Sequence, residues 1–168
     1  MNDLKLTLEP FALPPVDTEA VTQALVRAGY RFLTLAQTPD DETTRRELYA
    51  LVREGVTDTT GFSGEFETYE AFSERIYVRS YRGHAESQFL AACGNDWVGL
   101  SSFVRESAYR GRFGLTAVTR PHRGLGLARA LKSLALEYAR ASGVQMVVTE
   151  NHPENVAILG LNRALGFR

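Results

Sequence analysis

The chain has 168 residues, enough for one domain with a proper core, and its 44% hydrophobic and 23% charged residues are typical of globular proteins. Nineteen basic and twenty acidic residues nearly cancel, which argues against nucleic acid or a membrane surface as a partner. The single cysteine, Cys93, excludes an intrachain disulfide and favours a reducing cytoplasm, and no apolar run is long enough to span a bilayer.

The first half of the sequence predicts two strands and three helices. Alternating apolar and polar residues predict a strand over residues 4–8 and another over residues 30–36. Capping residues and apolar stripes predict helices over 17–29 and 39–55. A loop rich in glycine and threonine follows, and a short helix is expected from about Thr68.

The second half predicts a hairpin followed by a strand–helix–strand unit. Two strands are expected over residues 88–104, because the Gly-Asn-Asp sequence at 94–96 is a strong hairpin signal. Further strands are expected over 113–118 and 144–149, and a last helix begins after the His-Pro-Glu-Asn sequence and ends near Gly166. This order of elements predicts a mixed sheet covered by helices.

The helix between the last two strands follows a glycine-rich turn and is strongly amphipathic. The residues expected to face the core are Leu127, Leu131, Leu134 and Tyr138, and the charged residues expected to face solvent are Arg129, Lys132, Glu137 and Arg140.

The turn before this helix is a potential anion site, because unpaired backbone N–H groups and the helix dipole meet there. A Walker loop requires Lys-Ser/Thr after its last glycine, where Leu127 and Ala128 stand here, and a dinucleotide fingerprint requires glycine at Arg129. The pattern Arg/Gln-x-x-Gly-x-Gly/Ala is satisfied by Arg123, Gly126 and Ala128. A pyrophosphate clamp is therefore the interpretation that fits the turn.

This segment resembles the coenzyme A-binding motif of the GNAT superfamily, the Gcn5-related N-acetyltransferases. A second segment, residues 149–167, is similar to the strand–loop–helix of that family, with Asn155, Ile158, Gly166 and Phe167 at the motif positions. The two motifs cover roughly the last third of the chain in the family's order and spacing.

The resemblance implies an α/β (α+β) fold with a mixed, mostly antiparallel sheet that splays between its fourth and fifth core strands, 113–118 and 144–149. Acetyl-CoA is then the expected cofactor, with pantetheine in the wedge between these strands. The cofactor-binding residues that the resemblance implies are Leu115, Ala117, Val118, Arg123, Gly124, Leu125, Gly126, Leu127, Ala128, Arg129, Asn151 and Asn155.

The residues at the positions of the general acid and the general base differ from the family pattern. Many relatives carry a tyrosine as general acid where Asn162 stands, and many carry a carboxylate on the fourth strand, which has none here. Glu150 is the candidate general base, with Asn151, Glu65 and Glu67 as further candidates. A solvated surface position explains each of them too, and proton relay by water remains an alternative. His122 is interpreted as an exposed loop histidine, and no metal is expected.

The resemblance implies transfer of an acetyl group from acetyl-CoA to a primary amine of a small-molecule or peptide acceptor by direct attack. Two alternatives stay open: a coenzyme A-binding module without catalysis, as half of a tandem protein, and an unrelated nucleotide-binding domain. No nucleic-acid or membrane partner is expected, and a homodimer is compatible with the resemblance.

The resemblance also sets an expectation for the two ends of the sequence. One domain is expected over 1–168, with an N-terminal extension over 1–29 and a core over 30–168. Family members continue past the Gly-Phe of the second motif, so the closing strand is expected to be short or missing. Either the chain is a trimmed copy of a tandem domain, or residues 4–8 cover the sheet edge left there.

Overall fold

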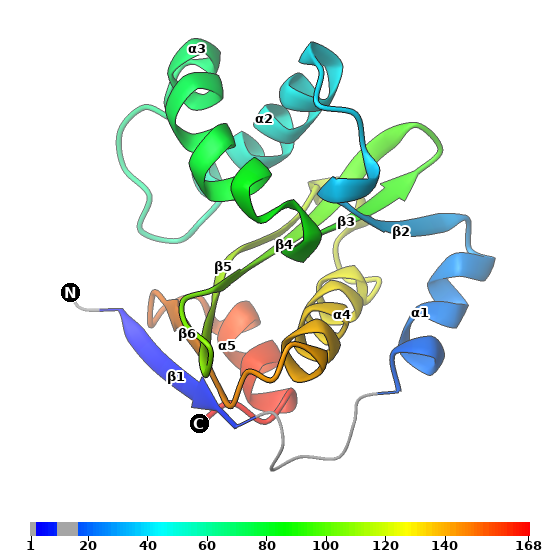
Figure 1. The fold of residues 1–168 in the computed structure, drawn as a ribbon, viewed down its shortest axis with the longest axis vertical. Coiled ribbons are helices and arrows are strands. Elements are labelled where there is room, and N and C mark those ends of the chain that lie inside the picture. Colours follow the sequence, from blue (N-terminus) through cyan, green and yellow to red (C-terminus); the bar gives the residue numbers. More distant parts are fainter. Residues whose placement is uncertain (1–2, 10–16) are drawn as a thin grey trace.

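A single six-stranded sheet organises the computed structural model, which describes residues 3–9 and 17–168 (Figure 1). Its order is β1-β6-β5-β4-β3-β2, and every neighbouring pair is antiparallel except β5 and β6. The strands are β1 (Leu4–Leu8), β2 (Tyr30–Thr34), β3 (Gln88–Cys93), β4 (Asp96–Arg105), β5 (Arg110–Val118) and β6 (Met146–Asn151). The predicted mixed, mostly antiparallel sheet is confirmed.

Helices cover both faces of this sheet (Figure 1). One face carries α2 (Glu42–Thr57) and α3 (Tyr69–Ala71), and α3 continues directly into η3 (Phe72–Tyr81) and η4 (Arg82–Ser87). The other face carries α1 (Thr18–Arg27), α4 (Leu127–Ala141) and α5 (Val156–Ala164). Short 3-10 turns, η2 (Leu35–Gln37) and η5 (Arg120–His122), follow β2 and β5. In the described part of the chain, no helix is both long and apolar enough to cross a bilayer.

Local sequence signals explain where these helices begin. The carboxylate of Asp17 accepts a hydrogen bond from the amide of Ala20, and that of Asp41 accepts one from Thr44, so both act as N-caps. Thr68 caps α3 in the same way. The predicted short helix from Thr68 is longer than expected, because its apolar side chains continue through η3 and are buried there.

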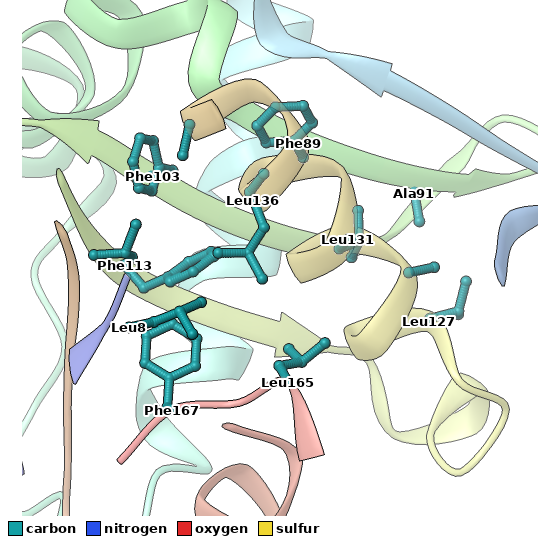
Figure 2. Close-up of a cluster of buried hydrophobic side chains, with 14 of the residues drawn as sticks. Leu8, Phe89, Ala91, Phe103, Phe113, Leu127, Leu131, Leu136, Leu165 and Phe167 are labelled. Atoms are coloured by element: carbon teal, nitrogen blue, oxygen red, sulfur yellow. The ribbon is translucent and has the colours of Figure 1, made fainter. Parts of the chain in front are cut away.

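Two hydrophobic clusters form the core, one on each face of the sheet. The cluster facing α4 contains four phenylalanines together with leucines of α4 (Figure 2), and Phe113 packs edge to face against both Phe103 and Phe167. The cluster facing α2 contains the predicted inward residues Leu48, Leu51 and Val52. These clusters hold β4 and β5 from both sides and fix the strands that border the candidate site.

The sheet opens between β5 and β6. The two strands pair only where residues 110–112 lie beside residues 146–148, and beyond this point β5 continues to Val118 without pairing with β6. The predicted splay between these strands is therefore confirmed. It leaves the β5 edge from Phe113 to Val118 facing an open wedge.

β1 covers the outer edge of β6. It runs antiparallel to β6, with Leu4 opposite Asn151 and Leu8 opposite Val147. On its other edge, Thr7 N donates to Arg168 O at 2.7 Å and Arg168 N donates to Thr7 O at 2.9 Å. The expectation that residues 4–8 cover this sheet edge is confirmed, whereas residues 1–2 and 10–16 of the expected N-terminal extension lie outside the described residues.

We expect Leu8→Ala to lower the free energy of unfolding by about 2–4 kcal/mol, because it removes buried methyl groups and leaves a cavity. Leu8 is 5% exposed and belongs to the cluster that contains Phe113 and Phe167. Leu4 on the same strand is 37% exposed, so Leu4→Ala is the matched control and should cost less than about 1 kcal/mol. Urea unfolding measures both, and equal, small losses would contradict the packing of β1.

Candidate functional site

The glycine-rich turn before α4 presents free backbone amides to a cavity. Gly124 and Gly126 have φ of +77° and +92°, a left-handed conformation that glycine adopts without strain. The first hydrogen bond of α4 runs from Ala130 N to Gly126 O, so the amides of residues 127–129 have no acceptor within the helix. Together with the helix dipole, these amides form an anion-binding surface.

A cavity of about 430 Å³, here called the turn cavity, lies beside this turn. It is bounded by the end of β5, the turn, α2 and α5. The predicted cofactor residues that line it are Ala117, Val118, Arg123, Gly124, Gly126, Leu127, Ala128, Arg129 and Asn155. Leu125 is different: its side chain is 52% exposed and lines a groove against α1 instead.

A second cavity of about 480 Å³, the wedge cavity, lies where β5 and β6 part. Its lining includes Gly114, Leu115 and Thr116 of β5, Glu150 and Asn151 of β6, His152, the loop residues 59–62 and Lys132 of α4. The two cavities share four lining residues, Thr59, Thr116, Asn155 and Ile158. They therefore meet along the open edge of β5.

Asp58 connects the turn to the end of α2, and the sequence alone did not indicate this residue. Its carboxylate accepts hydrogen bonds from Arg123 Nη2 at 2.6 Å and from Arg120 Nε at 2.9 Å. These two guanidinium groups lower the pKa of Asp58 to about 2. Arg123 Nε also donates to Val118 O at 2.8 Å, so the arginine side chain joins the turn, β5 and α2. A local sequence motif could not predict these contacts, because Asp58 is far in sequence from Arg120 and Arg123.

We expect Asp58→Asn to destabilise the fold in a pH-dependent manner. The pKa of Asp58 in the folded protein, about 2, is below its ordinary value of 3.8, so the wild-type carboxylate contributes stability above pH 4. This contribution should disappear as the pH falls from 4 towards 2. Urea midpoints of both proteins at a series of pH values test this, and a difference that stays constant down to pH 2 would contradict it.

Asn162 occupies the position of the family tyrosine, and it has a structural role. It is fully buried, and its Nδ2 donates to Asn151 Oδ1 at 2.8 Å. Thr149 Oγ1 donates to the same oxygen at 3.3 Å. Asn162 therefore holds the end of β6 against α5 and fixes Asn151 at the wedge cavity. Asn155 caps α5, because its side-chain oxygen accepts from Ile158 N at 3.4 Å.

The acidic candidates differ in how they meet the wedge cavity. Glu150 lines it, and its carboxylate accepts a hydrogen bond from Arg112 Nη1 at 3.1 Å. Glu67 instead forms an ion pair with Arg75, and neither it nor Glu65 lines the wedge cavity. The structure therefore brings Glu150 and Asn151 to the open strand edge and leaves the two loop carboxylates outside.

Two predictions about side-chain exposure were wrong. His122 is half-buried and lines the turn cavity, because its Nδ1 forms a 2.8 Å hydrogen bond with the hydroxyl of Tyr30. Lys132, expected to face solvent, is 1% exposed. Lys132 and its neighbours Leu131, Ala135 and Leu136 are all buried in α4, so the buried face of the helix is wider than the leucine pattern suggested. Within the described ranges, no cluster of three or more His, Cys, Asp or Glu could hold a metal ion.

The residues at the two cavities fit coenzyme A in chemical terms. The turn offers amide donors and a helix N-terminus for phosphates, at two glycines whose φ angles allow this backbone shape. The β5 edge from Phe113 to Val118 has no strand partner in the wedge, so its backbone groups are available to amides of an extended ligand. The site thus combines a phosphate-binding end and a strand-like end.

Comparison with known proteins agrees with this arrangement. The sequence model of the Acetyltransferase (GNAT) family matches residues 51–167, whereas none of the curated proteins matches the sequence. Among solved structures, Ard1 from Thermoplasma volcanium is similar with a TM-score of 0.66 and 18% identity, over 83% of each chain. YncA from Salmonella typhimurium, a putative acetyltransferase solved with its cofactor acetyl-CoA, gives a TM-score of 0.65 and 18% identity, over 83% of this chain and 80% of that one.

A tandem GNAT protein from the clavulanic acid biosynthesis pathway is also similar, with a TM-score of 0.65 and 22% identity. The match covers 99% of this chain and 50% of that protein, so this chain corresponds to half of the tandem protein's length. At these identities the solved structures establish the fold. Because the family model spans most of the sequence, including both motifs and the open strand edge, the chain belongs to the GNAT family of acetyltransferases.

Proposed function

We propose that this protein transfers an acetyl group from acetyl-CoA to a primary amine of a small-molecule or peptide acceptor. The observation that carries this proposal is the meeting of two cavities along the unpaired edge of β5. One cavity has the anion-binding turn, and the other has room for an acceptor at the point where the strands part.

Each part of the site has a distinct task in this proposal. The amides of residues 124–129 bind the pyrophosphate, and the backbone of Leu115, Ala117 and Val118 pairs with the pantetheine amides. Asn151 and Asn155 contact the cofactor from the other side of the wedge, since they line the cavities from β6 and α5. Acetyl-CoA, when bound, supplies an activated acetyl thioester.

The chain accelerates transfer mainly by positioning. The acceptor amine occupies the wedge cavity, and the loop residues 59–62 and His152 form part of its wall. Backbone amides of β5 polarise the acetyl carbonyl oxygen, where negative charge develops during attack. Holding two reactants in line can supply about 7–11 kcal/mol of the reduction in barrier, so the proposal does not require a strong acid–base pair.

A thiol-release assay tests the proposal. Acetyl-CoA is mixed with the protein and a panel of amines: amino acids, polyamines, amino sugars and peptides with free N-termini. At least one amine should accelerate release of coenzyme A thiol, with an acetylated product detectable by mass spectrometry. Calorimetric binding of coenzyme A without thiol release for any amine would instead favour the non-catalytic module. Preferential binding of ATP or NAD would contradict coenzyme A as the cofactor.

A further inference from the structure

Lys132 is the only charged side chain in the buried class among the described residues, with 1% of its surface exposed. Within that part of the chain, Lys132 makes no hydrogen bond or ion pair with another residue. Its Nζ lies 3.7 Å from the centre of the Phe113 ring and 5.8 Å from that of Phe167. The aromatic rings offset only part of the cost of burying an ammonium group, so the position is expensive for stability alone.

The position of this nitrogen coincides with the narrow end of the wedge. Arg112 is the last residue of β5 that pairs with β6, and Phe113 is the first beyond that point. Because Nζ lies against the Phe113 ring, it lies under the place where the strands part. Lys132 also lines the wedge cavity, together with Thr116 and Asn151. Of the residues that the structure describes, the only buried basic side chain thus lies at the cavity proposed for the acceptor.

Burial controls the charge of this lysine. Desolvation lowers the pKa of Lys132 to about 7, so its amine exchanges between charged and neutral forms near neutral pH. The titratable groups that face the same cavity are Asp3, Glu150 and His152. None of them forms a hydrogen bond or ion pair with Lys132 in the described part of the chain, and its Nζ lies over the rings of Phe113 and Phe167.

The choice of residue supports a role that requires proton exchange. Of the nineteen basic residues, Lys5 and Lys132 are the only lysines, and all others are arginines. Arginine keeps its proton in proteins, whereas a lysine in a desolvated site can release and accept one. Among the described residues, the only buried basic side chain is therefore a lysine, which can act as a base in its neutral form.

We propose that Lys132 is the general base of acetyl transfer and accepts the proton that the acceptor nitrogen loses. This inference rests on the proposed function. The acceptor nitrogen forms a C–N bond with the acetyl carbon while the C–S bond breaks and sulfur leaves as a thiolate. The excess proton on nitrogen passes to Nζ, and the resulting ammonium returns it to the thiolate, which restores the neutral amine.

Glu150 is the competing base at this cavity, and its contacts make it less suitable. Its carboxylate is bound by Arg112 Nη1 at 3.1 Å, and its side chain is 38% exposed. The Arg112 guanidinium thus already occupies one oxygen of this carboxylate, in an ion pair that is open to solvent. Lys132 has no such partner among the described residues.

Lys132→Met and Lys132→Arg test the inference, with Lys5→Met as the matched control. Lys5 is exposed on β1 and lines neither the turn cavity nor the wedge cavity. Both Lys132 variants should lower kcat by about a hundredfold or more, because methionine and arginine cannot accept a proton. The dissociation constant for coenzyme A, measured by calorimetry, should stay within about threefold of the wild-type value. If Lys132→Arg keeps partial activity and Lys132→Met has none, a positive charge at this position is sufficient. Lys132 would then act electrostatically and not as a base, which would overturn the inference.

The pH profile distinguishes a base from a structural residue. In the wild type, kcat/KM should rise through a step near pH 7 as Lys132 loses its proton, and this step should not move when the acceptor amine is changed. Lys132→Met should lack the step, whereas Lys5→Met should retain it. If Glu150→Gln abolishes the step and Lys132→Met does not, Glu150 is the base and the inference is wrong.

A spectroscopic titration provides a readout that needs no turnover. Protein labelled with [13C]lysine should give two side-chain Cε signals, which single-lysine variants assign to Lys5 and Lys132. We expect the Lys132 signal to titrate near pH 7, and titration close to the ordinary lysine value of about 10.4 would overturn the inference.

Wild-type protein that binds coenzyme A but acetylates no amine contradicts the proposed function instead. An active wild type with an unchanged Lys132→Met profile contradicts only the role of Lys132.

Discussion

Gly126→Ala should weaken coenzyme A binding by about tenfold or more, with little change in the rest of the fold. Gly126 is the N-cap of α4 and has a φ of +92°, where an added Cβ meets no neighbouring atom within 4 Å but strains the backbone. A left-handed conformation costs a residue with a side chain about 1–2 kcal/mol. Rotation of the turn relieves this strain and moves the amides of residues 127–129 away from the phosphates.

Gly143→Ala is the matched control for this prediction. Gly143 has a φ of +75°, also with open space around it, and follows the C-terminal end of the same helix. The two variants should lose similar stability in thermal unfolding, whereas only Gly126→Ala should lose affinity in calorimetry. Equal affinities for coenzyme A in both variants would show that the turn does not hold the phosphates.

Gly111→Ala should lower the free energy of unfolding by about 2–3 kcal/mol through overpacking. A Cβ at this position would lie 2.2 Å from Cζ of Phe103. Phe103 cannot move away easily, because its ring packs against Phe113 at a centroid distance of 5.5 Å and against Tyr138 at 6.2 Å. Gly111 also belongs to the short stretch that pairs with β6, so the clash acts directly at the base of the wedge.

Gly160→Ala is the control for overpacking. It is the same chemical change, but we expect it to raise the free energy of unfolding instead of lowering it. Gly160 lies in α5, and an added Cβ meets nothing within 4 Å. Alanine should stabilise the helix by about 0.5–1 kcal/mol, because glycine has more freedom to lose on folding. Urea unfolding measures both variants. A Gly111→Ala protein as stable as wild type would contradict the close packing of Phe103 on β5.

The sequence was sufficient to predict the features that depend on local chemistry. Helix caps such as Asp17 and Asn155, the hairpin at 94–96 and the glycine turn at 123–126 are read from neighbouring residues, and the structure contains each of them. The family resemblance implied the splay of the sheet, and the two strands that it named are the ones that part. The resemblance was most informative for the cofactor end of the site.

Features that depend on tertiary contacts were not predicted. Asp58 is joined to the turn only because α2 ends beside it, and Asn162 contacts Asn151 only because α5 packs on β6. Lys132 was assigned to the surface because charged residues are rarely buried, and helical spacing alone cannot show that a wedge opens above it. A wider apolar stripe, including Ala128 and Leu136 on either side of Lys132, was the one signal in the sequence.

A crystal structure with coenzyme A bound is the most direct test of the central claim that the turn and the open β5 edge hold this cofactor. We expect the pyrophosphate to lie within hydrogen-bond distance of the amides of residues 124–129. We expect pantetheine to lie beside Leu115–Val118, directed towards the wedge cavity. Coenzyme A bound elsewhere on the protein, or an empty β5 edge at saturating coenzyme A, would show that this site does not hold the cofactor.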